Sequence, residues 1–297
     1  MLSSRLDHLL TRFSAWRLGP PRDGSLPTRR IATPAGRVRV FDSGSAKPCV
    51  VIAPDGPNVI EHYEALIHRL APVHRVVCCD LPGFGHSLPA PTYTHSLDEG
   101  ARAVLAVLDA LGIARAALAF SCANGFYALR AAQLAPHRIM ALVLSQTPSM
   151  TAMHAWKRRV IPWPMTVPIV GQAAVWLARE KSAHGWYDHA LPHNRPRQPF
   201  RRLAQQAFSQ GACWCLASVT QGLARADVHS LRGITTPCTL LWGARDRSHR
   251  HTDPASLRDL VPGAEILRCA DSGHFPDLEQ PERFAALLGE RIAAATA

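Results

Sequence analysis

Cys122, Asp246 and His274 each stand a few residues after a short apolar run of the sequence. A thiolate is a stronger intrinsic nucleophile than a serine hydroxyl, and a nearby imidazole can lower the pKa of the thiol. A carboxylate can orient that imidazole and stabilise its protonated form. A lone cysteine is more often a small buried apolar residue. Together, however, these three side chains would support nucleophilic attack on an acyl compound.

The elements that must position these side chains alternate between strands and helices from residue 37 onward. The predicted strands are residues 38–41, 49–53, 75–79, 116–120, 140–145, 238–242 and 264–269. The predicted helices are residues 61–70, 97–111, 125–135 and 281–293. This alternation indicates an α/β fold with a mostly parallel sheet flanked by helices. In such folds catalysis takes place at the carboxyl ends of the strands.

The alternation is interrupted at residues 147–230, which are rich in proline, tryptophan and basic residues. We expect an inserted helical cap there, between a first core part at 37–146 and a second at 231–297. Residues 1–36 are predicted to form an N-terminal amphipathic helix and a linker. The apolar face of that helix would hold Leu2, Leu6, Leu9, Leu10 and Phe13. This face is expected to pack on the domain, with peripheral membrane contact or a dimer contact as alternatives.

Four segments together resemble the signatures of the α/β-hydrolase superfamily. They are Asp80–Ser87 (DLPGFGHS), Leu111–Ala116 (LGIARA), Leu241–Asp246 (LWGARD) and Gly273–Glu282 (GHFPDLEQPE). The resemblance covers roughly residues 37–146 and 232–295. It implies the α/β-hydrolase fold and a triad in the order nucleophile, acid, histidine. Asp246 is then the acid and His274 the base.

The nucleophile of this family stands in a G-x-S-x-G turn between a strand and a helix. Here the turn reads Phe120–Gly125 (FSCANG), and counting from the preceding Leu-Gly-Ile places Cys122 at the serine position. Ser121 is the alternative nucleophile, and an elbow without catalytic function is the other alternative. Phe120 and Asn124 replace the two glycines, and Asn tolerates tight turns better than most residues.

The oxyanion-binding segment also departs from the family pattern. The His-Gly that follows the first buried strand in the family is Asp55-Gly56 here, and the next residue, Pro57, has no N–H to donate. Losing one oxyanion donor can lower a rate by about 10²–10³. Asn58 is expected to replace it, and the Ala123 N–H to supply the second donor. Together with Gly56 and Ser121, these residues are predicted to line the oxyanion and substrate-binding site.

The charge of the chain suggests an anionic partner. The net charge is +11, and residues 151–225 hold ten basic residues against two acidic ones. The basic residues are Lys157, Arg158, Arg159, Arg179, Lys181, Arg195, Arg197, Arg201, Arg202 and Arg225. Such a surface can steer an anionic acyl carrier, either coenzyme A or an acyl carrier protein, or serve solubility alone. No nucleic-acid-binding motif accompanies the charge.

Other features of the sequence limit the remaining possibilities. The predicted cap holds Trp156, Trp163, Trp176, Trp186, Trp214, Met150, Met153 and Met165, which would form a small core or line an apolar pocket. We expect no transmembrane segment and no signal peptide. Eight cysteines are too few for a disulfide scaffold, which favours reduced thiols and a cytoplasmic location. We predict neither a metal site nor a cofactor, and expect His86 and His249 at loop or surface positions without a catalytic role.

These observations predict an enzyme that processes an acyl compound with a Cys-His-Asp triad. A thioester is the favoured substrate because attack by a thiol on a thioester is close to isoenergetic. The product would be released by hydrolysis, transfer or cyclisation. An ester or lactone hydrolase is the first alternative, since dienelactone hydrolases resemble this chain in having Cys at the elbow. A non-hydrolytic member, either a cofactor-free lyase or isomerase or a ligand-binding protein, is the second.

Overall fold

The computed structural model describes residues 2–18, 25–209, 212 and 214–296. Within these residues nine strands form one sheet. The strands are β1 (Thr28–Thr33), β2 (Gly36–Asp42), β3 (Cys49–Ala53), β4 (Arg75–Asp80), β5 (Leu88–Pro89), β6 (Ala116–Ser121), β7 (Ile139–Ser145), β8 (Cys238–Gly243) and β9 (Glu265–Cys269). Their order is β1-β2-β4-β3-β6-β7-β8-β9, with β5 against β2. Pairing is parallel from β4 to β9, which confirms the predicted sheet.

The central strands are buried on both faces. Every residue of β3, β6, β7 and β8 is buried, which is why these strands read as continuous apolar runs in the sequence. In β3, Val51 packs into the core on one side of the sheet, and Val50 and Ile52 pack into the core on the other. Two apolar layers therefore hold the sheet in place.

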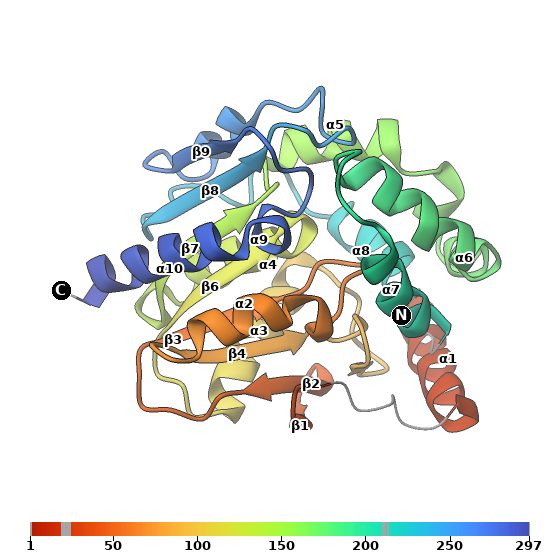
Figure 1. The fold of residues 1–297 in the computed structure, drawn as a ribbon. Coiled ribbons are helices and arrows are strands. Elements are labelled where there is room, and N and C mark those ends of the chain that lie inside the picture. Colours follow the sequence, from red (N-terminus) through yellow and green to blue (C-terminus); the bar gives the residue numbers. More distant parts are fainter. Residues whose placement is uncertain (1, 19–24, 210–211, 213, 297) are drawn as a thin grey trace.

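Helices cover both faces of the sheet (Figure 1). The helices α2 (Glu64–Leu70) and α10 (Pro281–Thr296) pack together on one face, and α3 (Leu97–Ala110) and α4 (Cys122–Leu134) on the other. Ser96 accepts a hydrogen bond from the Glu99 N–H and begins α3. Gly112 follows α3 with a φ of +62°, as its predicted place at the helix end requires.

Between β7 and β8 the chain forms a helical insertion (residues 147–230). Its elements are α5 (Met150–Val160), η3 (Trp163–Thr166), α6 (Val170–Ala190), α7 (Gln198–Ser209) and α8 (Trp214–Leu223). Figure 1 shows them beyond the carboxyl ends of the parallel strands. Met150, Met153 and Trp156 are buried in the main core, whereas Trp163 is 73% exposed. Some apolar residues of the insertion therefore belong to the core, and others lie at the surface. The Trp214 side chain lies outside the described structure.

The N-terminal helix α1 (Leu2–Leu18) packs against α8 and β5, and Leu10 is the member of the predicted apolar face that packs against a core cluster. That prediction was wrong for Leu2, Leu9 and Phe13, which are exposed. The buried residues of α1 include Ser4, Asp7 and Ser14 instead. The physical reason is a polar contact, because the Ser218 hydroxyl of α8 donates to the Asp7 carboxylate. None of the described helices is long and apolar enough to cross a membrane.

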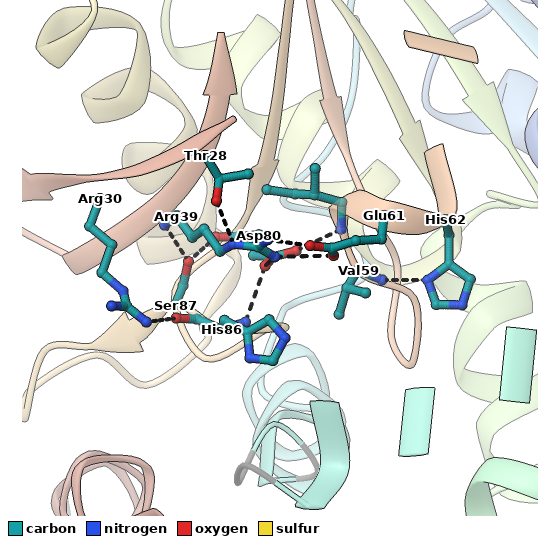
Figure 2. Close-up of polar contacts among 10 residues, drawn as sticks. Thr28, Arg30, Arg39, Val59, Glu61, His62, Asp80, His86 and Ser87 are labelled. Carbon is teal, nitrogen blue, oxygen red and sulfur yellow. Dashed lines mark hydrogen bonds and ion pairs between the residues drawn. The ribbon is translucent and has the colours of Figure 1, made fainter. Parts of the chain in front are cut away.

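A buried ion-pair network joins the loop after β3 to the loop after β4 (Figure 2). Arg39 pairs with both Glu61 and Asp80. Asp80 also accepts the backbone N–H groups of Ile60, at 3.2 Å, and His86, at 3.1 Å. Removing one member of such a buried network is strongly destabilising. Asp80, the first residue of one of the four sequence signatures, thus fixes the loops around the candidate site, and His86 lies half-buried in one of these loops.

Candidate active site

The turn between β6 and α4 places Cys122 at the carboxyl edge of the sheet. Cys122 is the first residue of α4 and has a φ of +48°, which a non-glycine residue adopts only where its surroundings impose it. The Thr147 hydroxyl donates to the Cys122 carbonyl over 3.1 Å. A Cβ atom at residue 125 would lie 2.1 Å from that hydroxyl, so Gly125 is required there. The segment after β7 therefore holds the turn in its left-handed conformation.

The two residues that depart from the family turn are accommodated by packing. Phe120 is 1% exposed and pairs with Ala53 and Leu144 within the sheet, so its bulk lies in the core. Asn124 is buried, and its side-chain amide donates to the Pro54 carbonyl over 2.8 Å. This bond ties the start of α4 to the segment after β3. The sharp turn is thus formed without the usual glycines.

Ser121 and Cys122 face different partners. The Ser121 hydroxyl donates to Asp277 Oδ2 over 2.9 Å, and the Tyr63 hydroxyl donates to the same oxygen over 2.8 Å. The Cys122 sulfur lies within 4.8 Å of a ring nitrogen of His274. Both side chains therefore contact a carboxyl group, Ser121 that of Asp277 and Cys122 that of Asp55, but the Cys122 sulfur also lies beside the histidine.

Asp246 and His274 form a buried pair. His274 Nδ1 lies 2.6 Å from Asp246 Oδ2. Burial alone would raise the pKa of Asp246, but the charge and hydrogen bond of His274 lower it below its ordinary value. The Gln146 amide and the Ser248 backbone N–H also donate to Asp246, over 2.6 and 2.8 Å. Burial would lower the pKa of His274, but Asp246 and then Asp55 raise it. An ionised acceptor at Nδ1 leaves Nε2 as the nitrogen for proton transfer.

Close backbone contacts bring this pair together from two loops. Asp246 follows β8, and His274 follows β9. A Cβ atom at Gly243 would lie 1.7 Å from the Gly273 carbonyl oxygen, so the two loops meet only because residue 243 has no side chain. The His274 N–H donates to the Ala190 carbonyl of α6 over 2.7 Å. The last residue of α6 therefore helps to fix the histidine.

His249 lies close to Cys122 and His274, although its place in the sequence predicted no role in the site. It lies in the loop after β8, as expected, but it is buried and not at the surface, with 2% of its area exposed. Its ring stacks on Trp156 at 4.9 Å and on His274 at 5.4 Å, as measured between ring centroids. A ring nitrogen of His249 lies within 4.8 Å of the Cys122 sulfur. Its position three residues after Asp246 was the signal available in the sequence.

The charges around Cys122 are mostly negative. Burial raises the pKa of the Cys122 thiol well above its ordinary value, and the carboxylates of Asp55 and Asp246 raise it further. The Ala123 backbone N–H acts in the opposite direction. Burial also raises the pKa of Asp55 to about 7, although the charge of His274 acts to lower it. Near pH 7 both the neutral and the ionised form of Asp55 are therefore present, and the ionised form makes the Cys122 thiolate harder to form.

Two of the residues predicted for the oxyanion site, Gly56 and Asn58, belong to the segment that follows Asp55. Pro57 has no N–H, and the peptide bond between Gly56 and Pro57 is cis. Asn58 is 1% exposed and accepts a hydrogen bond from the Tyr187 hydroxyl of α6 over 2.9 Å. Its side-chain N–H₂ group has no hydrogen-bond partner among the described residues. The amide of Asn58 thus retains donors that a ligand could use.

The helical insertion closes over this group of residues. Trp186 of α6 meets the His274 ring edge-on, with 5.1 Å between centroids. Cys122 is 4% exposed and His274 is fully buried. A pocket of about 260 Å³ is lined by Asp246, His249, Asp253 and Arg268, among others. Access to the sulfur in this conformation is therefore restricted by α6.

Comparison with known proteins identifies the family of this chain. A profile of the alpha/beta hydrolase family matches residues 49–287. The 2-hydroxymuconate semialdehyde hydrolase of Pseudomonas sp. (strain CF600) is 26% identical over 294 residues, covering 94% of this chain and 99% of the relative. The pimeloyl-(acyl-carrier protein) methyl ester esterase of Stenotrophomonas maltophilia is 27% identical over 250 residues, covering 78% and 88%. Epoxide hydrolase A from Mycobacterium thermoresistibile has a TM-score of 0.72 at 18% identity, covering 89% and 97%. The chain therefore belongs to the alpha/beta hydrolase family.

Proposed function

We propose that this protein is a hydrolase of acyl compounds that uses Cys122 as nucleophile, His274 as base and Asp246 to orient the histidine. The observation that carries the proposal is the left-handed Cys122 beside His274, whose Nδ1 lies 2.6 Å from Asp246. The relatives that are themselves hydrolases support the reaction class. A thioester is the favoured substrate, because the acyl group would pass from one sulfur to another.

The reaction follows from these groups. His274 Nε2 takes the proton of the Cys122 thiol, and the sulfur attacks the acyl carbon, forming a carbon–sulfur bond and an oxyanion. The oxyanion collapses to an acyl-enzyme, and the leaving thiol or alcohol takes the proton from His274. Water, deprotonated by His274, then attacks the acyl-enzyme. The carboxylic acid leaves and the thiol of Cys122 is restored.

Three donors are available for the oxyanion. We propose that they are the Ala123 N–H, the side-chain amide of Asn58 and the protonated carboxyl of Asp55. The pKa of Asp55, raised to about 7 by burial, supports a neutral acid that can donate a hydrogen bond. The ionised form would repel an oxyanion. This arrangement would compensate for the missing N–H of Pro57.

We further propose that the helical insertion acts as a cap that recruits an anionic acyl carrier, either coenzyme A or an acyl carrier protein. Arg158, Arg159 and Arg202 are exposed. Arg201, in contrast, pairs with Asp188 and is less available to a partner. One relative is named as an esterase of an acyl-carrier-protein ester, which supports this class of substrate.

Paired measurements test the reaction and the carrier. Hydrolysis of a panel of thioesters and esters is expected to disappear in Cys122→Ala and to persist in Ser121→Ala, while both proteins stay folded. Full activity in Cys122→Ala would refute the proposed nucleophile.

The carrier test compares kcat/KM for a carrier-bound substrate and a short neutral thioester at low and high salt. Charge reversal at Arg158, Arg159 and Arg202 should slow only the carrier-bound substrate, because charge steering acts over about 8 Å at physiological salt. If kcat/KM of both substrates responds equally to salt and to charge reversal, the basic surface serves solubility and does not recruit a carrier. A neutral ester or lactone would then be the better substrate.

A further inference from the structure

Three potential metal ligands converge at the turn that carries Cys122. Its sulfur and one ring nitrogen each of His249 and His274 all lie within 4.8 Å of one another. Bond lengths of about 2.0–2.3 Å around tetrahedral zinc set distances of about 3.5 Å between ligand atoms. A contraction of about 1 Å would therefore bring all three atoms to bonding distance of one ion.

In each of the two histidines, Nδ1 has a polar partner and Nε2 has none among the described residues. Nδ1 of His274 contacts Asp246, and Nδ1 of His249 lies 3.2 Å from the Thr252 hydroxyl. Both Nε2 atoms are buried, and neither has a hydrogen-bond partner within the described part of the chain. Buried polar atoms normally have partners. A carboxylate on the far nitrogen is also the usual support of a metal-bound histidine.

The surrounding charge favours a cation. The Asp246 carboxylate acts on both the Cys122 thiol and His274, and Asp55 adds to its charge when it is ionised. On His249, the Asp246 carboxylate acts in the same sense, against the charges of His274 and Arg159. A metal ion would displace the thiol proton and neutralise part of this negative charge. The pocket of about 260 Å³ reaches His249 and provides an entry path for an ion.

We propose that Cys122, His249 and His274 bind one thiophilic divalent cation such as Zn²⁺, and that this ion reversibly blocks the reaction proposed above. Three protein ligands leave a fourth coordination position for water. Coordination occupies both the sulfur and the Nε2 lone pair of His274, which the hydrolytic reaction needs. The inhibitory role rests on the proposed function, whereas metal binding itself does not.

Metal binding can be measured without a substrate. The full-length protein is treated with a chelator, titrated with Zn²⁺, and exposed to iodoacetamide, and alkylation of Cys122 is followed by mass spectrometry. Zn²⁺ should protect the thiol, and Co²⁺ should give a thiolate charge-transfer absorption. Protection should strengthen as the pH rises, because metal and protons compete for the same atoms.

Variants of His249 identify the ligand set. His249→Phe keeps an aromatic ring between Trp156 and His274 but removes both nitrogens, and His249→Gln is a second, smaller replacement. Each should raise the Zn²⁺ concentration for half-protection at least about tenfold, since loss of even an outer-shell partner costs about 10–100-fold in affinity. His251 is exposed, so His251→Gln is the matched control. It should leave the Zn²⁺ concentration for half-protection unchanged.

The outcomes separate the two proposals. Equal half-protection in the wild type and both His249 variants, or the absence of a Co²⁺–thiolate absorption, would overturn the metal site. Stimulation of hydrolysis by bound Zn²⁺ would overturn its inhibitory role. Failure to detect hydrolysis of any acyl compound would contradict the proposed function but leave the alkylation result standing.

A second inference rests on α1, whose exposed face is apolar and basic. Leu2, Leu9, Phe13 and Trp16 are 67%, 61%, 53% and 79% exposed. Arg5, Arg12 and Arg17 are also exposed, and Asp7, the acidic residue of this helix, is buried. Apolar and aromatic side chains interleaved with arginines are typical of helices that lie in the interface of an anionic membrane.

We infer that α1 binds the surface of an anionic lipid bilayer through this face. The full-length protein should sediment with vesicles of phosphatidylcholine and phosphatidylserine, and less with phosphatidylcholine alone. Binding should be lost in the triple variant Leu9→Ser, Phe13→Ser, Trp16→Ser. The control is Val73→Ser with Leu134→Ser, which changes exposed apolar residues elsewhere. Absence of vesicle binding would overturn the inference. So would a dimer in solution that dissociates into monomers in the triple variant.

Discussion

Replacing Asp55 by asparagine perturbs the electrostatics of the site with little change in shape. Burial raises the pKa of Asp55 from 3.8 to about 7, so the folded protein holds a proton that the unfolded chain loses between about pH 4 and pH 7. The stability that comes from this protonated group is therefore lost as the pH rises through that window. The two units from about pH 5 to pH 7 correspond to about 2.7 kcal/mol, at about 1.36 kcal/mol per unit. Asparagine does not titrate and avoids this loss.

Urea unfolding at about pH 5 and pH 8 measures the effect. The free energy of unfolding of Asp55→Asn, relative to the wild type, should increase by about 2–3 kcal/mol between the two pH values. Asp259→Asn, an exposed acidic residue, should show no such change. Alkylation of Cys122 should also be faster in Asp55→Asn, because the Asp55 carboxylate raises the pKa of the thiol. The same stability difference at both pH values would refute the reasoning.

Further substitutions test the other groups of the site. His274→Ala should remove activity, and Asp246→Asn should lower kcat by up to about 10⁴; a harmless Asp246→Asn in steady-state assays would place the acid elsewhere. Asn58→Ala should lower the rate of hydrolysis by about ten- to a thousandfold. Tyr187→Phe removes only the hydroxyl that contacts Asn58, so its rate should stay closer to that of the wild type. Similar rates for these two variants would argue against Asn58 as an oxyanion donor. Trp186→Ala should speed alkylation of Cys122 several-fold by opening the contact of α6 with His274, and an unchanged alkylation rate would show that Trp186 does not restrict access.

Much of the fold was predictable because its signals are local. Residues 49–53 form a strand with the predicted bounds, since a fully buried strand reads as one apolar run. The helix after Ser121 begins three residues earlier than the predicted 125–135. The left-handed turn at Cys122 lets the helix start at once, and no apolar periodicity marks such a start. Asp246 and His274 could be paired only through the family resemblance.

The remaining features depend on contacts between distant parts of the chain. The burial of His249 comes from Trp156, far away in the sequence, and from the path of the loop after β8. The buried face of α1 holds Asp7, which accepts a hydrogen bond from Ser218, whereas Leu2, Leu9 and Phe13 are exposed. Periodicity identified α1 as a helix but could not identify which face would be buried.

If Cys122 carries the acyl group during turnover, rapid quenching will trap the acyl-enzyme. The wild-type protein is mixed with an activated thioester, quenched in acid within milliseconds, digested and mapped by mass spectrometry. We expect an added acyl mass on the peptide that contains Cys122, and fragmentation of the peptide should locate the mass at that residue. The same adduct should form in Ser121→Ala and be absent in Cys122→Ala. An acyl group on Ser121, or undiminished turnover in Cys122→Ala, would contradict this role of Cys122.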